Sequence, residues 1–221
     1  MTQRRSLPSQ TGACRNEDVI ACVRYILCRE GSKLPIPRVD IANHLKSTCD
    51  TPKNDVNNVI AAADKHLRNV YGYKLETVDT KTVQYILVLL EPCDSPISPL
   101  MDVHEQRLLN VALAHIFMSG GSVKDEDMWT FLIKAKLMNE NDGAVIKLFT
   151  KKFTSQLYIS AVTEGEGELA KKKFIWGPRA NKETSKMFIL NKIAEALNKT
   201  PDHWCEQHKI ATSEAPPATS V

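Results

Sequence analysis

The sequence predicts a mainly α-helical fold with small β wings (α+β), built from two winged-helix domains in tandem. The same order of elements, three amphipathic helices followed by a β-hairpin, occurs twice along the 221 residues. A segment with two prolines and two serines, residues 93–99, separates the two copies and is typical of a linker. Hydrophobic residues make up 43% of the chain and charged residues 25%, as in ordinary folded proteins.

Apolar residues at three- and four-residue steps predict the three helices of the first unit. The first helix is expected between a capping residue, Asn16, and a stop at Gly31. The second is expected to begin near Pro37, because proline suits the first turn of a helix. The third is expected to run from Val56 to Gly72.

The first wing is predicted from alternating apolar and polar residues. Residues 73–78 alternate as a strand does, and residues 82–90 are rich in β-branched and aromatic side chains. Asp79, Thr80 and Lys81 lie between them and predict the turn of a hairpin.

The second unit repeats this order. Residues 108–117 predict a helix that ends at Gly120 and Gly121. Ser122 and Asp125 resemble a capping box, which predicts that a second helix begins there. A third helix is expected over residues 144–153.

The second wing is predicted from strands over residues 157–162 and 173–176, joined through a loop tip at 164–168. An amphipathic helix over residues 184–197 follows. The predicted organisation is a disordered tail (1–14), winged-helix A (15–92), a linker (93–103), winged-helix B (104–210) and a second disordered tail (211–221).

Several classes of protein are excluded by the same sequence. The longest apolar run, residues 86–90, is far shorter than the roughly 20 residues that span a bilayer. No apolar segment follows Arg4 and Arg5, so we expect no signal peptide and no membrane partner. The six cysteines form no CxxC pair, which favours reduced thiols in the cytosol or nucleus.

No motif predicts an active site. His203, Cys205 and His208 offer three metal ligands, but their spacing matches no common zinc pattern, and we interpret this stretch as a surface helix or tail. The glycines of residues 164–168 lack the strand, helix and lysine of a phosphate-binding loop. We therefore expect no catalytic residue, no metal and no cofactor.

Basic residues are concentrated in the second unit. Between Lys147 and Lys192 there are ten basic and four acidic residues, although the whole chain carries only +3. Lysines on a wing strand or at the end of the third helix of a winged helix can contact phosphates without reading bases. The alternative is a solvated lysine-rich face. The candidates for non-specific binding of double-stranded DNA are Lys151, Lys152, Lys171, Lys172, Lys173 and Lys182.

Several motifs resemble those of one family. Residues 174–180, Phe-Ile-Trp-Gly-Pro-Arg-Ala, followed by Glu-Thr-Ser at 183–185, resemble the WGPRA…ETS signature of the MAGE homology domain. Residues 67–72, 116–120 and 147–150 resemble other motifs of that family, and Tyr158 falls where the family has the tyrosine that begins the wing strand. The resemblance covers about residues 15–210.

Within the family, residues 33–38, 70–75 and 183–187 look most like the branch that forms the third non-SMC element of the SMC five–six complex. This resemblance implies tandem winged helices, no catalytic centre, and a nuclear role in chromosome maintenance and DNA repair. It also implies three kinds of protein partner: a RING-type ubiquitin ligase subunit, a kleisin subunit and, through the complex, SMC-type ATPases.

The family's RING-binding surface includes two adjacent leucines in the first helix. The matching residues are Tyr25, Ile26, Leu27 and Cys28, so the aliphatic pair is either Ile26–Leu27 or Leu27–Cys28. Adjacent helical residues point about 100° apart, so both members of a pair cannot occupy the centre of one buried face. We expect one of them to face the partner.

The resemblance also implies a kleisin-binding groove in the second unit. Its candidates, with the core of that unit as the alternative reading, are Trp129, Phe131, Phe149, Phe153 and Leu157. The turn at Trp176, Gly177 and Pro178 is expected to fix the wing strand against the last helix, with Gly177 permitting unusual backbone angles.

Three other functions stay open. The chain could be a free-standing MAGE-type regulator of a RING ligase outside any SMC complex. It could be a winged-helix transcription factor, although its helices offer few Arg, Asn or Gln side chains for base edges. An enzyme without a recognised motif is the third.

Overall fold

The computed structural model describes residues 15–78, 82–90, 101–164 and 171–214. The predicted linker segment 93–99, the turn at 79–81, all but the first residue of the loop tip at 164–168, and the predicted tail 1–14 lie outside the described residues. Of the predicted tail 211–221, residues 215–221 lie outside them, whereas residues 211–214 belong to a helix and contradict the prediction. Among the described residues, no helix is long and apolar enough to cross a membrane.

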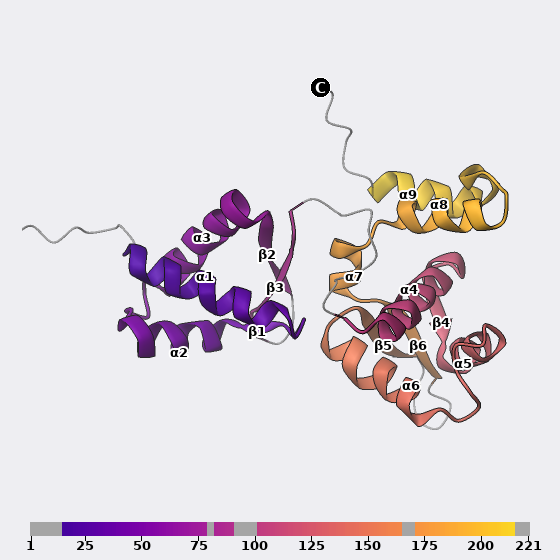
Figure 1. Ribbon diagram of the computed structural model, residues 1–221, viewed down its shortest axis with the longest axis horizontal. Helices are drawn as coiled ribbons and strands as arrows, with labels where there is room; N and C mark the ends of the chain where they lie inside the picture. Colours follow the sequence, from indigo (N-terminus) through magenta and orange to yellow (C-terminus); the bar gives the residue numbers. More distant parts are fainter. Residues whose placement is uncertain (1–14, 79–81, 91–100, 165–170, 215–221) are drawn as a thin grey trace, which may run out of the picture.

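The first unit packs three helices against a small antiparallel sheet (Figure 1). Its helices are α1 (Asn16–Glu30), α2 (Arg38–Cys49) and α3 (Val56–His66), the last continuing as a π-helical turn, η1 (Leu67–Tyr71). Its strands are β1 (Ile36–Pro37), β2 (Tyr73–Val78) and β3 (Gln84–Leu89), in the order β1-β3-β2. Residues such as Cys22, Ile26, Leu45, Val59 and Leu67 are fully buried and form its core.

The second unit repeats the arrangement with its own core. Its helices are α4 (Val103–Met118), α5 (Asp125–Lys134) and α6 (Gly143–Lys147), the last continuing as a π-helical segment, η2 (Leu148–Phe153). Its strands are β4 (Ser122–Lys124), β5 (Ile159–Glu164) and β6 (Lys171–Trp176), in the order β4-β6-β5. Because both sheets place the returning wing strand at the centre, the predicted fold, mainly α with small β wings in tandem winged helices, is confirmed.

Three predicted helix starts need correction. Ser122 does not cap a helix, because it lies in β4 and the helix begins at Asp125 after Lys124. The cap of α1 is Arg15 rather than Asn16, and its side chain makes no capping bond. α4 begins at Val103, where Asp102 accepts hydrogen bonds from two backbone amides, so the predicted linker is too long at its end.

The chain ends in helices that the winged-helix pattern does not contain. After β6 come α7 (Pro178–Glu183), α8 (Lys186–Ala196), a 3-10 turn, η4 (Pro201–His203), and α9 (Cys205–Glu214). α8 and α9 lie side by side on the upper side of the second unit (Figure 1). Ala211 of α9 is buried, so the predicted limit of winged-helix B at residue 210 falls too early. The other domain limits stay predictions.

The turn after β6 works differently from the prediction. The indole Nε1 of Trp176 donates to the backbone oxygen of Leu113, 2.9 Å away, which ties the wing to α4. Gly177 has an ordinary φ of −80°. A Cβ atom there would lie under 3.0 Å from the backbone oxygen of Leu157, so the position excludes a side chain through lack of space rather than through unusual backbone angles.

Candidate partner and nucleic-acid surfaces

The four candidates for the RING partner on α1 divide between core and surface. Ile26 is fully buried in the core of the first unit. Tyr25 and Leu27 are half-buried, and Cys28 is exposed. Ile26 therefore offers no area to a partner. The candidates that reach the surface are Tyr25, Leu27 and Cys28, and Tyr25 and Leu27 lie on opposite sides of buried Ile26 because residues two positions apart in a helix point about 160° apart.

Tyr25 joins α1 to α2. Its ring stacks on the imidazole of His44 at a centroid distance of 4.4 Å, and the guanidinium of Arg29 lies 4.7 Å from its ring centre. Burial raises the pKa of Tyr25 above its ordinary value, and nearby Arg29 opposes this only in part. The phenol is therefore protonated at neutral pH, and its hydroxyl is available as a hydrogen-bond donor.

Two of the candidates for the kleisin partner lie at the surface of α5. Trp129 is half-buried and meets the rings of Phe149 and Phe174 edge to face. Phe131 is half-buried and stacks on His115 of α4, with centroids 3.8 Å apart. Burial lowers the pKa of His115, with Asp127 opposing, so its ring is neutral at pH 7.

The other three kleisin candidates do not line a surface groove. Phe149 and Phe153 are fully buried in the core of the second unit, as the alternative reading held. Leu157 packs against the sheet of the first unit, on a cluster of three buried residues: Val78, Ile86 and Val88. Leu157 therefore belongs to the junction between the two units, and no feature of the sequence predicted that contact.

The three consecutive lysines of β6 point to both sides of the sheet. Because side chains alternate along a strand, Lys171 and Lys173 share one face, while Lys172 lies on the face of buried Phe174. Lys173 is paired with Glu164, and this pairing lowers the pKa of the Glu164 carboxyl. Lys171 and Lys172 are exposed and pair with no described carboxylate.

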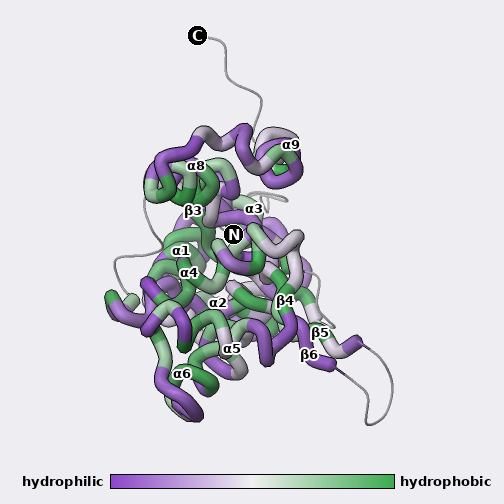
Figure 2. Tube along the Cα trace, turned by 90° about the vertical axis from the view of Figure 1, so that its right-hand side faces the viewer, coloured by the Kyte–Doolittle hydropathy of each residue, from purple (hydrophilic) through white to green (hydrophobic). Residues whose placement is uncertain are grey.

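Sequence reasoning missed one basic residue on this sheet. Lys124 of β4 lies directly opposite Lys173 of β6, so both are on the same face, next to Lys171. The short strand that places Lys124 there has only three residues, too few for an alternating pattern to reveal it. The face formed by Lys124, Lys171 and Lys173 is called the wing face below. In Figure 2 the end of β5 and the start of β6 are hydrophilic.

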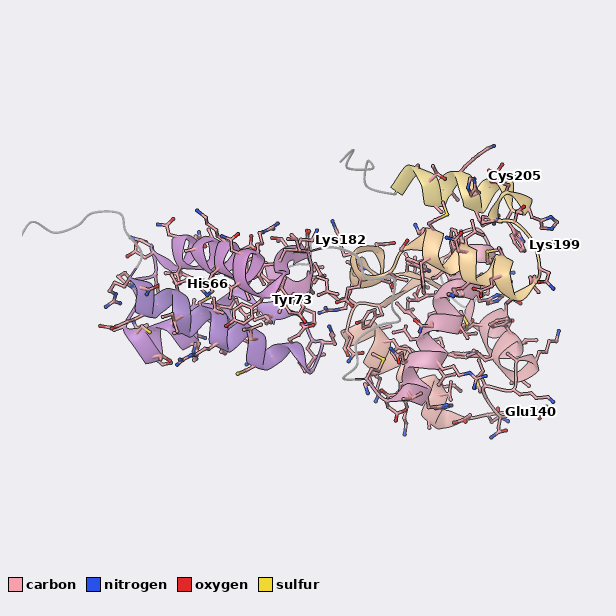
Figure 3. All side chains as sticks on the ribbon, turned by 45° about the horizontal axis from the view of Figure 1, so that its top comes forward. His66, Tyr73, Glu140, Lys182, Lys199 and Cys205 are labelled. Atoms are coloured by element: carbon pink, nitrogen blue, oxygen red, sulfur yellow. The ribbon has the colours of Figure 1, made fainter. Side chains whose placement is uncertain are left out.

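The remaining lysine candidates lie elsewhere. Lys151 is exposed on η2, with no ion pair to any described residue. Lys152 is paired with Glu105 at the start of α4. Lys182 of α7 lies at the junction of the two units, 3.7 Å from Glu76 of β2 (Figure 3). Burial raises the pKa of Glu76, but Lys74 and Lys182 outweigh it and lower the pKa overall.

The described residues contain no group of three histidine, cysteine or acidic side chains that could hold a metal ion. In the stretch from His203 to His208, Nε2 of His208 lies 3.4 Å from Asp202 and the ring of His203 contacts Trp204. These side chains thus contact one another or nearby residues rather than converging on one point.

Comparison with known proteins relates this chain to a protein family. The model of the MAGE homology domain matches residues 22–87 and 92–187. The mouse non-structural maintenance of chromosomes element 3 homolog is 30% identical over 213 residues, covering 91% of this chain and 75% of its own length. The human homolog is 31% identical over 199 residues, covering 87% of this chain and 64% of its own length.

Other matches extend the comparison. Human MAGE-like protein 2 is 31% identical over 205 residues, which cover 90% of this chain but 16% of that protein. Among solved structures, a chain of an Nse1-Nse3-Nse4 complex matches with a TM-score of 0.75 and 31% identity, covering 89% of this chain and 97% of that one. The family model ends at residue 187, so most of α8 and all of α9 lie beyond it.

Proposed function

The chain belongs to the MAGE homology domain family, and on that premise we propose that it is a non-catalytic scaffold subunit of the SMC five–six complex. In this role it binds a RING-type ubiquitin ligase subunit and a kleisin subunit, and through them it joins the SMC-type ATPases. The observation that carries the proposal is the match, over 89% of this chain, to a chain of an Nse1-Nse3-Nse4 complex. Nuclear localisation and a role in DNA repair follow from the same assignment.

The mechanism is positioning rather than chemistry. A scaffold stabilises the active arrangement of a partner when its contacts favour that arrangement over others. Leu27 supplies an aliphatic side chain for a RING partner's apolar surface, and Tyr25 and Cys28, three positions apart on α1, supply an aromatic and a small side chain on another side of the helix. Trp129 and Phe131 supply aromatic area for the kleisin on α5.

The wing face supports a weak contact with double-stranded DNA. Lysine ammonium groups at Lys124, Lys171 and Lys173 bind phosphate oxygens as point charges and read no base sequence. Exposed Lys151 and Lys172 add positive charge from η2 and from the other face of the sheet. Such binding is non-specific and depends on salt.

The binding of a purified RING subunit by calorimetry tests the first partner surface. Leu27→Ala is expected to weaken binding by more than tenfold, about 1.4 kcal/mol, and Tyr25→Ala to weaken it as well. The matched control is Val39→Ala, which removes an exposed aliphatic side chain from α2 of the same unit. If Leu27→Ala and Val39→Ala bind alike, α1 does not form the proposed surface.

A second candidate function rests on the match to human MAGE-like protein 2, whose identity to this chain equals that of the human element 3 homolog. The chain would then regulate a RING ligase outside any SMC complex. This alternative requires the RING surface but predicts no kleisin binding, whereas the scaffold role predicts such binding. Titration with a purified kleisin subunit, with Trp129→Ala as the control, therefore distinguishes the two functions.

A further inference from the structure

Arg179, the second residue of α7, is buried at the junction of the two units with 1% of its surface exposed. Within the second unit, its Nε donates to the backbone oxygen of Gln156 at 3.0 Å. Its Nη1 donates to the carboxylate of Glu183 at 2.8 Å, and Glu183 also accepts from the hydroxyl of Tyr158 at 2.6 Å. These bonds fix the guanidinium on the second unit and neutralise its charge.

The same guanidinium reaches into the first unit. Its Nη1 also donates to the backbone oxygen of Leu87 in β3, and its Nη2 donates to the backbone oxygen of Lys33, just after α1, both at 3.0 Å. Backbone oxygens are placed by the fold itself and cannot swing away as a side chain does. Arg179 therefore connects the main chain of one unit to that of the other.

Further contacts surround this connection. The amide Nε2 of Gln156 donates to the backbone oxygen of Ser32 at 3.0 Å, and Leu157 packs on the apolar cluster of the first unit. The ammonium of Lys33, itself buried, pairs with Glu30 and lies 3.7 Å from Glu183. The junction thus contains two buried cations and two mostly buried carboxylates, whose charges balance.

We propose that Arg179 is the positioning residue that holds the two winged-helix units in one fixed arrangement. Without its guanidinium, the buried carbonyls of Leu87 and Lys33 would lose their side-chain donors, and Oε1 of Glu183 would keep only the ammonium of Lys33, 3.7 Å away, which is costly. Hydration of these groups relieves that cost, so loss of the guanidinium favours separation of the units, which exposes them to water. The proposal concerns the free chain, so its failure would leave the scaffold role untouched.

Two native cysteines permit a direct test. Cys28 of the first unit and Cys205 of the second are exposed, whereas Cys22 is buried and burial raises its pKa to about 12, so it resists labelling. With Cys14, Cys49 and Cys93 changed to serine, spin labels on Cys28 and Cys205 report the distance between the units by double electron–electron resonance. The labelled chain that retains Arg179 is expected to give a single narrow distribution of distances.

Two variants remove the contacts of the Arg179 guanidinium in different ways. Arg179→Gln removes the charge and most donors, while Arg179→Lys keeps a cation beside Glu183 but loses the planar fork that reaches two carbonyls at once. Both are expected to replace the narrow distribution with a broad one. The matched control, Lys182→Gln, removes a charge from the same helix and an exposed ion pair across the same junction, and is expected to keep the narrow distribution.

A broad distribution in the unmodified chain overturns the proposal, as does a narrow one in a folded Arg179 variant. Folding of the second unit is checked by tryptophan emission, because Trp129, Trp176 and Trp204 all lie there and supply all three tryptophans of the chain. If Arg179→Gln fails to fold, Arg179→Lys provides the test. A broad distribution then supports the proposed role of Arg179, and a narrow one rejects it.

Discussion

Ile26 is fully buried in the core of the first unit, whereas Cys28, two residues further along α1, is exposed. Truncating a buried isoleucine removes apolar contacts and leaves a cavity, so Ile26→Ala is expected to lower the free energy of unfolding by about 2–5 kcal/mol. Cys28→Ala is expected to change it by less than about 0.5 kcal/mol. Urea denaturation followed by circular dichroism measures both, and equal losses would contradict the assignment of Ile26 to the core.

His115 makes the stability of the protein depend on pH in the mildly acidic range. Its pKa in the folded state is lowered by burial, so the unfolded chain takes up a proton first as the pH falls. Its contribution to stability is complete above about pH 6.5 and decreases below it. The fall in unfolding free energy from pH 7.5 to 5.5 should be smaller in His115→Gln than in the unmodified chain. An equal fall in both would reject this role.

Residue roles could be predicted only in part. Helical geometry required that Ile26 and Leu27 differ in exposure, but periodicity alone could not say which one lies inside. The role of Arg179 was not predictable, because its two acceptors in the first unit lie 92 and 146 positions away in the sequence. Its family motif marked the residue without showing what it contacts.

At the scale of elements, the turn from β6 to α7 leaves no space for a side chain at Gly177. A methyl group at Gly177 would clash with the backbone of Leu157 and Tyr158, neither of which can move as a flexible side chain does. Gly177→Ala is therefore expected to lower the free energy of unfolding by about 3 kcal/mol.

The control for this prediction is Gly143→Ala in α6, where an added Cβ would meet no atom within 4 Å. Alanine favours the helix over glycine, so this variant is expected to be neutral or stabilising by up to about 1 kcal/mol. Tryptophan emission during urea denaturation measures both variants. Similar losses in the two would show that space at Gly177 is not the constraint.

The long amphipathic helices and both hairpins were predictable from periodicity and turn residues. The strands β1 and β4 were not, since two or three residues carry no readable alternation and their pairing is provided by β3 and β6. The missed β4 also hid the contribution of Lys124 to the wing face.

For the whole molecule, the small net charge of +3 conceals a basic wing face. If its lysines contact phosphates, the logarithm of the DNA binding constant should fall with the logarithm of salt concentration by about 0.9 per contact. Changing Lys171 and Lys173 to Glu together should weaken binding and reduce that slope by about 2. Fluorescence anisotropy with a duplex of arbitrary sequence measures the slope.

The control for the wing face is Lys209→Glu, which reverses an exposed charge on α9. It is expected to leave the slope nearly unchanged. A slope that is equally reduced in the control, or that survives the double change, would assign DNA contact to net charge or to another surface.

The measurement that tests the scaffold role most directly is affinity isolation of the tagged full chain from its cells of origin, with identification and quantification of the proteins bound to it. The account predicts a RING-type ligase subunit, a kleisin and the two SMC-type ATPases, recovered together in comparable amounts. Recovery of a RING ligase without a kleisin or SMC-type ATPases would contradict it.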